Sequence, residues 1–408
     1  MRLVVLTPHF APDLAPTGVV VTRLVEELAE RDHEIEVITS LPWYRDHRIE
    51  PGYEGKLVRT EDAPWGRIIR LHPFPTSDKT DLVRRAASFI GFTALSVLKG
   101  RKGARVDGVL ALSPPLTLGL AGRAIADRRH AAYVFNIQDV FPDIAIELGY
   151  LSNATLIRSA KALERRCYER ADAITVLSED LKANVARKVS DPSKIRVIPN
   201  FVDTATIQPG EHENEYRREH GLEGKTVVMY AGNVGLSQSL DLFIDAAVAL
   251  RDDPSLHFVI NGTGAARTEL EDHARGLSNV TFVDPQPIER LAEVLAAADI
   301  HVVVLKKGLA RSSVPSKTFS ILAAGRPFVA SVDPGSEIAE IADRSGAGIS
   351  VPPNDAEAFV KAIDHLIEHP DERIGMGENA RSFVEAWASP AAVAATYEDL
   401  FAELRGPS

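Results

Sequence analysis

The sequence of 408 residues contains a single cysteine, Cys167, and therefore no pair that could form a disulfide within the chain. One cysteine also excludes a cysteine-rich zinc site, and such sparse use of cysteine is typical of proteins in a reducing compartment. The N-terminus lacks the long apolar segment and the small-residue cleavage site of a signal peptide. We therefore expect a cytoplasmic protein.

Positive charge is also in short supply. The chain carries 46 Lys and Arg against 57 Asp and Glu, a net charge of -11. This balance argues against a broad surface for nucleic acid, which is not expected as a partner. Hydrophobic residues make up 45% and charged residues 25%, as in ordinary soluble globular proteins. A chain of this length exceeds one ordinary core and is most simply two domains of about 200 residues each.

Several common catalytic motifs are missing as well. The sequence has no Gly-x-Ser-x-Gly elbow, no His-Glu-x-x-His pair and no Walker lysine. Its 12 histidines are scattered. The sequence therefore does not indicate a serine hydrolase of the elbow type, a zinc protease or a P-loop nucleotidase. No metal site is expected.

Short apolar strands alternate with helical patterns along both halves of the chain, which is typical of parallel sheets covered by helices. We therefore expect an α/β fold of two Rossmann-like, doubly wound domains, residues 1–200 and 201–387, with a final helix within residues 388–408. Two such domains facing a cleft would bind ligands at the carboxyl ends of their strands. The strands are expected at Leu3–Leu6, Ile35–Thr39, Gly108–Leu112, Ala132–Phe135, Ala173–Val176, Ile195–Ile198, Thr226–Tyr230, His257–Asn261, Val280–Val283, Ile300–Leu305 and Phe328–Ser331.

Two loops that follow strands of the first domain carry candidate site residues. His9 begins a loop that reaches Gly18 before a helix, where glycine allows a ligand to approach the backbone closely. Glycine is equally common at such turns for structural reasons. Gln138 and Asp139 emerge at a strand end, where a carboxylate can bind a sugar hydroxyl or act as a base. The structural alternative for Asp139 is a cap on the following turn.

Two glycine-containing loops follow strands of the second domain. Asn233 and Gln238 lie in a polar loop with two glycines, residues 230–239, which resembles a phosphate cradle without the usual cation. Asn261 and Gly262 begin an Asn-Gly-Thr-Gly loop that could approach a nucleotide base. A single Gly-x-Gly pattern is a weak signal, so both loops also fit ordinary turns.

Residues 313–327 combine small polar side chains with one lysine and run straight into a short apolar helix. Hydroxyls, backbone N–H groups and a cation at a helix start are suited to a phosphorylated ligand. Arg311 lies just upstream, and Ser316, Lys317 and Ser320 lie within the segment. We predict that these residues bind a diphosphate; the alternative is an ordinary loop with a serine cap.

Residues 86–98 form a run without charge that is flanked by basic residues and is too short to span a bilayer, which needs about 20 apolar residues. Such a helix can lie in the headgroup region of an anionic leaflet; the alternative is a core helix with solvated ends. We predict peripheral membrane contact through residues 84–105. The candidates for this surface or for the acceptor site are His9, Arg84, Arg85, Phe89 and Phe92.

Taken together, these loops resemble glycosyltransferase family four, which has the two-domain GT-B fold. Within that family, the chain resembles the branch of colanic-acid and N-acetylfucosaminyl transferases of envelope polysaccharide synthesis. Order and spacing make the resemblance specific, and it covers nearly the whole chain. The motifs are His9–Asp13 with Gly18, Gln138-Asp139 with Pro142-Asp143, Ile198–Asn200, Tyr230–Asn233, Gly262–Gly264, Val314–Lys317 and Ala324–Pro327.

The resemblance implies transfer with retention of anomeric configuration from a nucleotide-sugar, with a UDP-sugar expected as donor. It implies that the second domain holds the donor, that the first holds a glycan or polyprenyl-linked acceptor, and that the final helix crosses back to the first domain. No cofactor or metal is required in such a reaction. Cations and backbone dipoles on the departing diphosphate supply electrostatic stabilisation. The expected location is the inner face of the plasma membrane.

Several positions depart from the family pattern. The two glutamates that many members have eight residues apart fall on Ser312 and Ser320. The usual Arg and Lys of the glycine loop fall on Asn233 and Gln238, and the usual His of the first domain falls on Gln138. The resemblance therefore implies a variant site in which Lys317, helped by Arg311, balances the diphosphate. In that variant Asp139 or Gln138 contacts the transferred sugar, and Gly18 belongs to the donor site with the loops of the second domain.

Two other functions fit the same pattern. The loss of the glutamates also suits a catalytically inactive protein that binds a sugar nucleotide. An epimerase acting on a UDP-sugar is the third option, because GT-B folds host that chemistry too, although an apolar helix at residues 86–98 has no purpose there.

Overall fold

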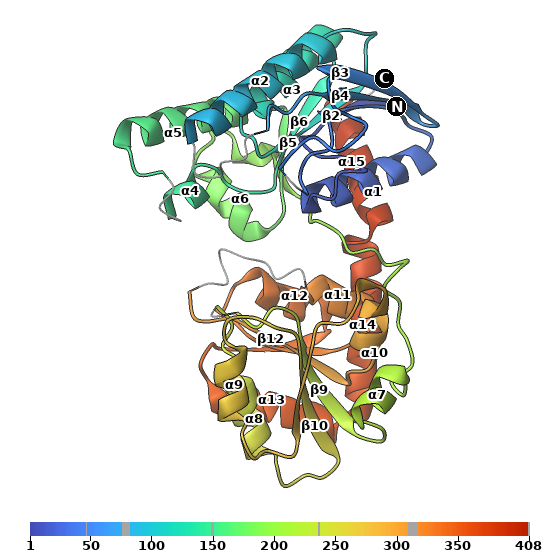
Figure 1. The fold of residues 1–408 in the computed structure, drawn as a ribbon, viewed down its shortest axis with the longest axis vertical. Coiled ribbons are helices and arrows are strands. Elements are labelled where there is room, and N and C mark those ends of the chain that lie inside the picture. Colours follow the sequence, from blue (N-terminus) through green and yellow to red (C-terminus); the bar gives the residue numbers. More distant parts are fainter. Residues whose placement is uncertain (46, 76–81, 148–150, 236, 309–316, 407–408) are drawn as a thin grey trace. The chain divides into compact units, whose positions relative to one another are not determined.

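The computed structural model describes residues 1–45, 47–75, 82–147, 151–235, 237–308 and 317–406, except the side chains of residues 82–86 and 147. The chain divides into two compact units (Figure 1). The first unit comprises Met1–Asn200 and Pro390–Ser408, and the second comprises Phe201–Ser389. The chain thus leaves the first unit after Asn200 and returns to it at Pro390.

The first unit is built on an eight-stranded sheet in the order β3-β4-β2-β1-β5-β6-β7-β8. All neighbours are parallel except β3 and β4, which form an antiparallel pair. The strands are β1 (Arg2–Leu6), β2 (Glu34–Ser40), β3 (Val58–Ala63), β4 (Gly66–Leu71), β5 (Gly108–Ser113), β6 (Ala132–Ile137), β7 (Ala173–Val176) and β8 (Ile195–Val197), the last preceded by a 3-10 turn at Pro192–Lys194.

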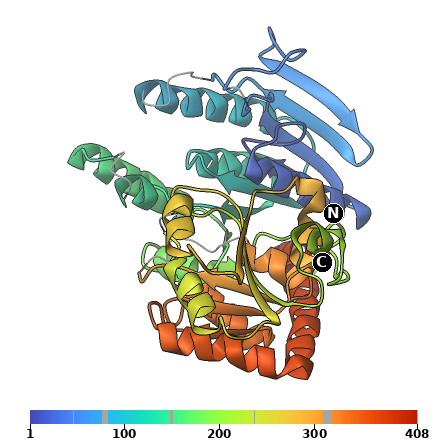
Figure 2. The ribbon, with the colours of Figure 1, turned by 60° about the horizontal axis from the view of Figure 1, so that its bottom comes forward.

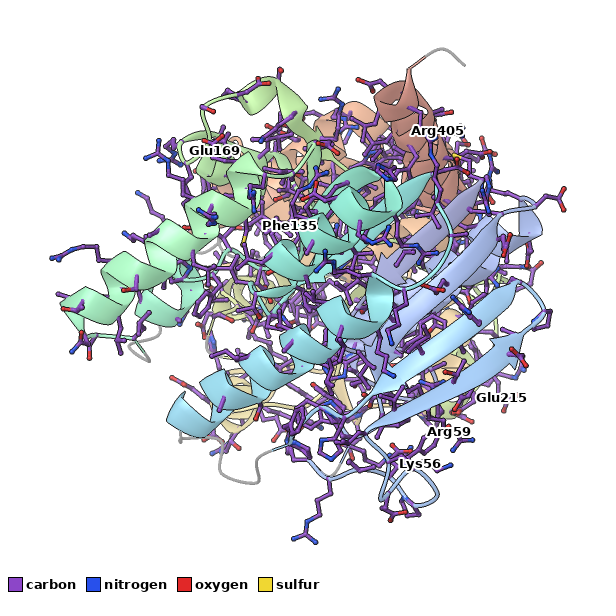
Figure 3. The ribbon with its side chains drawn as sticks, turned by 90° about the horizontal axis from the view of Figure 1, so that it is seen from above. Lys56, Arg59, Phe135, Glu169, Glu215 and Arg405 are labelled. Carbon is purple, nitrogen blue, oxygen red and sulfur yellow. The ribbon has the colours of Figure 1, made fainter. Side chains whose placement is uncertain are left out.

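Helices cover both faces of this sheet, because successive strand residues such as Val4 and Val5 point to opposite sides and both are fully buried. Phe135, labelled in Figure 3, packs beneath α2, α3 and α5 on one face. On the other face α1 packs against α15. The helices are α1 (Pro16–Glu30), α2 (Leu82–Gly100), α3 (Leu118–Arg129), α4 (Asp143–Glu147), α5 (Ala154–Glu169), α6 (Glu179–Ala186) and α15 (Pro390–Arg405).

The second unit is built on a six-stranded, wholly parallel sheet in the order β11-β10-β9-β12-β13-β14. The strands are β9 (Thr226–Ala231), β10 (Leu256–Asn261), β11 (Val280–Val283), β12 (Ile300–Val304), β13 (Phe328–Ser331) and β14 (Gly348–Val351). The helices are α7 (Glu215–His220), α8 (Asp241–Ala249), α9 (Arg267–His273), α10 (Leu291–Ala296), α11 (Lys317–Ala323), α12 (Glu337–Ser345), α13 (Ala356–Glu368) and α14 (Pro370–Trp387), with a 3-10 turn at Ile288–Arg290.

Two separate cores lie on the two faces of this second sheet. Helices α8, α9 and α13 pack on one face around Phe243 and Phe258. The other face carries α10, α11, α12 and α14 around Phe328, and the helices flank the sheet in Figure 2. The predicted fold class, two Rossmann-like α/β sheets of parallel strands, is confirmed.

The prediction from sequence was wrong about two features of the first unit. It missed β3 and β4, because β3 is a half-exposed edge strand whose charged residues hide the apolar alternation. It also placed Gly18 in a loop before the first helix, whereas α1 begins at Pro16 with proline in its first turn. Gly18 therefore lies inside the first turn of α1 and is buried.

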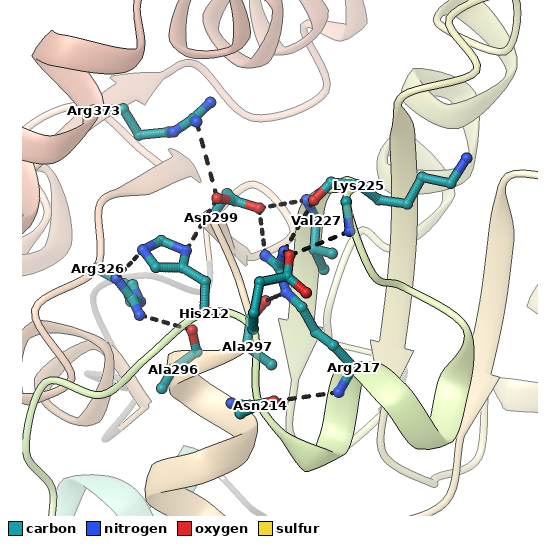
Figure 4. Close-up of polar contacts among 12 residues, drawn as sticks. His212, Asn214, Arg217, Lys225, Val227, Ala296, Ala297, Asp299, Arg326 and Arg373 are labelled. Atoms are coloured by element: carbon teal, nitrogen blue, oxygen red, sulfur yellow. Dashed lines mark hydrogen bonds and ion pairs between the residues drawn. The ribbon is translucent and has the colours of Figure 1, made fainter.

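A buried polar network lies at the amino ends of the strands in the second unit (Figure 4). Asp299, which precedes β12, accepts hydrogen bonds from Arg217 Nη2 at 2.6 Å and from the backbone N–H of Val227 at 2.7 Å. His212 Nδ1 lies 3.1 Å from the same carboxylate. A cavity of about 760 Å³ opens beside these residues. Ligands of doubly wound folds bind at the opposite, carboxyl edge, so we assign this network to stability.

Asp299→Ala is expected to lower the free energy of unfolding of the second unit by about 1–3 kcal/mol, because it removes the buried acceptor of Arg217 Nη2 and of the Val227 N–H and leaves Arg217 only the more exposed Glu213 as an acidic partner. Burial alone would raise the pKa of Asp299, but hydrogen bonds from His212 and Val227 and the charge of Arg217 lower that pKa to about 2. The contribution is therefore complete above the unfolded value of about 4 and is lost as pH falls towards 2.

Urea denaturation of the wild type and Asp299→Ala at pH 7 and at pH 3 measures this effect. The difference between the two proteins should shrink at the lower pH. Asp252→Ala is the control, because the Asp252 side chain is 98% exposed, and it should change stability by less than about 0.5 kcal/mol. Equal stability of Asp299→Ala and the wild type at pH 7 would contradict the assignment.

Candidate functional site

The loops after β9 and β10 pack backbone against backbone at the carboxyl edge of the second sheet. The N–H of Gly232 donates to the carbonyl of Asn261 at 2.9 Å, and the N–H of Val234 donates to the carbonyl of Thr263 at 2.9 Å. A side chain at residue 262 would collide with the carbonyl oxygen of Gly232. The close contact between the two loops is therefore enough to explain a glycine at residue 262.

Lys317 reaches this edge from the start of α11. Its Nζ donates to the hydroxyl of Tyr230 at 2.7 Å and lies 3.9 Å from the centroid of the same ring. The Tyr230 hydroxyl in turn donates to the carbonyl of Asn233 at 2.6 Å. A Cβ built on Gly232 would lie 3.6 Å from the lysine Nζ, so the glycine leaves the ammonium group uncovered on that side.

Within the described part of the chain, no carboxylate balances the charge of Lys317. The side chain is half-buried, and no Asp or Glu forms an ion pair with it among the residues that the structure describes. Burial lowers the pKa of Lys317 to about 7, because a cation loses hydration there without gaining a carboxylate. A bound anion would restore that balance, which makes this ammonium group a candidate for anion binding.

Other predicted donor-site residues have different surroundings. The side-chain oxygen of Gln238 accepts from the N–H of Gly235 at 3.0 Å and braces the loop. The side-chain oxygen of Asn261 accepts from the hydroxyl of Tyr216 at 3.0 Å and is buried. Asn233 is exposed, and Ser320 lies one turn after Lys317 on α11. Arg311 and Ser316 fall outside the described residues.

Gln138 and Asp139 lie at the carboxyl end of β6 in the first unit. The amide of Gln138 is held on both sides: Nε2 donates to Asn136 Oδ1 at 2.6 Å, and Oε1 accepts from Asn200 Nδ2 at 2.8 Å. Asp139 is exposed, and desolvation by neighbouring atoms raises the pKa of its carboxyl. Its backbone carbonyl rather than its carboxylate accepts from the N–H of Phe141, so the carboxylate does not cap this turn.

A pocket of about 520 Å³ lies at the carboxyl edge of the first sheet. His9 Nδ1 lies 2.7 Å from Asp13 Oδ2, and the other oxygen of this buried carboxylate accepts from the N–H of Tyr44 at 3.1 Å. The His9 ring stacks on Trp43 at a centroid distance of 5.7 Å. The remaining apolar wall includes Phe89 and Phe92 from α2.

Gly18 packs against this pocket rather than opening onto a ligand. A side chain at residue 18 would meet the Cβ of His9 at 3.0 Å and the carbonyl oxygen of Asp13 at 3.2 Å. The glycine lets α1 begin directly beneath the His9 loop. Close packing is therefore enough to explain a glycine at residue 18. Its contact with a donor stays a prediction.

The outer face of α2 is apolar and exposed. Ala87, Ile90, Ala94 and Leu98 fall on one stripe at helical spacing, with Ile90 63% and Leu98 58% exposed. The exposed residues Arg101, Lys102 and Arg105 follow the end of this helix. Phe92 faces inward and is only 4% exposed. The side chains of Arg84 and Arg85 lie outside the described residues, and no helix of the described chain is long and apolar enough to cross a bilayer.

The sequence reading assigned no role to Tyr230, Asp13 or Trp43. Asp13 follows His9 by four residues, a spacing that could have indicated the pair. The contact between Lys317 and Tyr230 joins residues 87 positions apart, and no local pattern reports such a distance.

Two α/β units of mainly parallel strands, each with its candidate site loops after strands, have the architecture of the GT-B fold. Residues 17–200 match the glycosyl transferase 4-like domain, and residues 225–369 match the glycosyl transferases group 1 domain. The chain belongs to the group 1 glycosyltransferases.

Among its relatives is WcaI of Escherichia coli K12, a glycosyl transferase assigned to colanic acid biosynthesis. The two proteins are 28% identical over 91% of this chain and 93% of WcaI. Among solved structures, sucrose-phosphate synthase from Thermosynechococcus elongatus has a TM-score of 0.68 at 19% identity, with both chains covered completely. HepE of Anabaena, solved in complex with UDP, has a TM-score of 0.66 at 13% identity over 98% of this chain and 99% of HepE.

Lys317→Met should raise the stability of the second unit below pH 7. The folded pKa of Lys317, about 7, lies below the ordinary value of about 10.4, so the unfolded chain binds more protons between these values. The cost of the buried cation is therefore complete below pH 7 and fades as pH rises towards 10. Each 1 kcal/mol removed should raise the thermal midpoint by about 2–4 °C.

Thermal melts at pH 6 and pH 9.5 test this expectation, with Lys307→Met as control because Lys307 is exposed. The gain from Lys317→Met should be larger at pH 6. A variant that is less stable than the wild type at pH 6 would show that Lys317 serves the fold rather than a ligand.

Proposed function

We propose that this protein is a retaining glycosyltransferase that moves a sugar from a nucleotide-sugar to a glycan or lipid-linked acceptor. The observation that carries the proposal is the half-buried ammonium group of Lys317, which has no acidic partner among the described residues and lies beside the glycine loop after β9. A diphosphate leaving group gains negative charge as the bond to the sugar breaks. A fixed cation in a partly dry site stabilises that charge more strongly than water does.

A UDP-sugar is the proposed donor. HepE, which shares the fold, was solved in complex with UDP, and that complex supports the choice. Lys317 supplies the positive charge that a metal ion would otherwise bring to the diphosphate, and we propose that Arg311 assists it. The reaction then needs neither a metal nor a cofactor.

The first unit is proposed to contribute the groups that contact sugars. Gln138 and Asp139 present an amide and a carboxylate at the end of β6, and both can hydrogen-bond the hydroxyls of the transferred sugar. The pocket beside His9 has the size of a small-ligand site, and we propose that it holds the acceptor. The name of WcaI, which refers to colanic acid, supports an acceptor in envelope polysaccharide synthesis.

The apolar stripe of α2 is proposed to dock on the anionic inner face of the plasma membrane. Exposed Ile90 and Leu98 would enter the interface, while Arg101, Lys102 and Arg105 would contact lipid headgroups. This contact would bring a lipid-linked acceptor to the pocket that the inner side of α2 lines.

Lys317→Ala should lower kcat for sugar transfer or donor hydrolysis by about 100-fold to 1,000-fold, because one electrostatic contact to the leaving group is lost. The measurement is release of UDP from UDP-sugars by the full chain. Lys307→Ala is the matched control and should retain wild-type turnover. Normal turnover of Lys317→Ala would remove the assigned role of this residue.

The same experiments separate the other two functions. A wild-type protein that binds UDP in calorimetry, yet neither transfers nor hydrolyses any donor, would be an inactive sugar-nucleotide-binding protein. Interconversion of UDP-sugars without an acceptor would identify an epimerase.

Flotation with vesicles of phosphatidylglycerol and phosphatidylcholine tests the membrane contact. Replacing Arg101, Lys102 and Arg105 by Gln should lower recovery in the floating fraction by about 10-fold or more, since each basic residue near an anionic surface contributes about 1 kcal/mol. Ile90→Ser with Leu98→Ser should lower recovery at low and high salt alike.

The control replaces three exposed basic residues of the second unit, Arg251, Arg275 and Lys361, by Gln. This variant carries the same change in charge and should float like the wild type. Equal recovery of all variants would contradict docking through α2.

A further inference from the structure

The amide of Gln138 ends a chain of hydrogen bonds that crosses the carboxyl edge of the first sheet. Asn136 Nδ2 donates to Thr175 Oγ1 and to the Tyr397 hydroxyl, at 3.0 Å in each case. Asn136 Oδ1 accepts from Gln138, and Gln138 Oε1 accepts from Asn200. These hydrogen bonds therefore join β7, α15, β6 and Asn200, the residue at which the polypeptide leaves the first unit.

The direction of each bond follows from the donors and acceptors that each group possesses. Both N–H groups of Asn136 are used on Thr175 and Tyr397, so its oxygen must face Gln138. The Nε2 of Gln138 is therefore turned towards Asn136, and its oxygen is turned towards Asn200. A primary amide carries two N–H donors and an oxygen with two acceptor sites. One N–H and one acceptor site of Gln138 consequently remain for a ligand.

The far end of the chain is well fixed. Asn136 is 2% exposed, Thr175 is fully buried and Tyr397 is 4% exposed. Burial raises the pKa of the Tyr397 hydroxyl to about 12, so the group stays protonated at any working pH. Gln138 and Asn200, in contrast, are half-buried. The buried residues therefore fix the orientation of the partly exposed amide of Gln138.

We propose that Asn200 and Tyr397 are positioning residues that lock the amide of Gln138, so that it presents one N–H and one carbonyl oxygen to the sugar in a fixed sense. This inference rests on the proposed function, in which Gln138 contacts the transferred sugar. An unlocked amide would present its nitrogen and oxygen in either order. Each wrong order places two donors or two acceptors face to face with a sugar hydroxyl and costs a buried hydrogen bond.

The position of Asn200 gives this lock a second property. Asn200 is the residue at which the chain leaves the first unit, and Phe201 is the first residue of the second. Tyr397 lies on α15, the helix on which the chain returns. The residue at which the chain leaves the first unit therefore bonds to Gln138, and a residue of the helix on which it returns bonds to Asn136, the neighbour of Gln138 in the same chain of hydrogen bonds.

Kinetics of the full chain test the proposal. Asn200→Ala and Tyr397→Phe should each lower kcat with a UDP-sugar by about 10-fold to 100-fold, as expected for a misplaced contact group. The dissociation constant of UDP should stay within about twofold, because the proposed diphosphate contacts lie in the second unit. A network that serves the fold alone would lower thermal stability and leave kcat of the folded protein unchanged.

Asn200→Asp is the sharpest variant, because it keeps the shape and replaces the donor by an acceptor. The carboxylate repels Gln138 Oε1 and favours the reversed amide, so kcat should fall at least as far as in Asn200→Ala. Asn153→Asp is the matched control: Asn153 caps α5 through its side-chain oxygen, and Asp caps a helix equally well. This control should keep wild-type kcat.

A measurement without turnover separates this inference from the proposed function. The chain contains four glutamines, so selective labelling with 15N at the side-chain amide gives few signals, and Gln138→Met identifies the signal of Gln138. We expect that signal to show slow hydrogen exchange in the wild type and at least 10-fold faster exchange in Asn200→Ala. Unchanged exchange overturns the lock even if the enzyme is active, whereas a protected signal in a protein without transferase activity overturns the proposed function alone.

Discussion

Parallel strand pairing is the constraint from which the rest of this structure follows. When neighbouring strands run in the same direction, each connection must cross the sheet, and every loop that leaves a carboxyl end emerges at the same edge. In the second unit this brings the loops after β9 and β10 into backbone contact and leaves Lys317 at the same edge. In the first unit it brings together the His9 loop and the loop after β5. Residues far apart in sequence become neighbours without any local signal.

The alternation of short apolar strands with helical patterns predicted most strands of the two sheets, because strands buried on both faces form nearly continuous apolar runs; β3, β4 and β14 were missed. The same rule explains what was missed. Strand β3 lies at the edge of its sheet, and its exposed residues remove the apolar run on which the prediction depended. The start of α1 was misplaced because its first turn contains proline and glycine, which also read as loop residues.

Some properties of the candidate site could likewise be predicted from sequence, and others could not. Sequence could identify Lys317 as a cation in a polar turn. It could not show that the cation lacks an acidic partner among the residues that the structure describes, since that depends on which elements pack nearby. It also could not distinguish amides that serve the protein from amides left for a ligand. The side-chain oxygen of Asn261 accepts a hydrogen bond from Tyr216, whereas Gln138 keeps one N–H group and one acceptor site for a ligand. The glycines are ambiguous for the same reason. At Gly18 and Gly262 other atoms of the protein lie where a side chain would be, and a ligand that approached the backbone closely would also require glycine.

The return of the chain at Pro390 has a consequence for how the protein is made. Helix α15 covers one face of β5, where Phe401 occupies the space that a side chain at residue 108 would need. The first unit therefore lacks part of its core until α15 has been synthesised, and every strand of the second unit precedes α15 in the chain. The unit that is translated first is thus completed last, and until α15 packs the growing chain exposes an apolar face of its sheet, the kind of surface that promotes aggregation during folding.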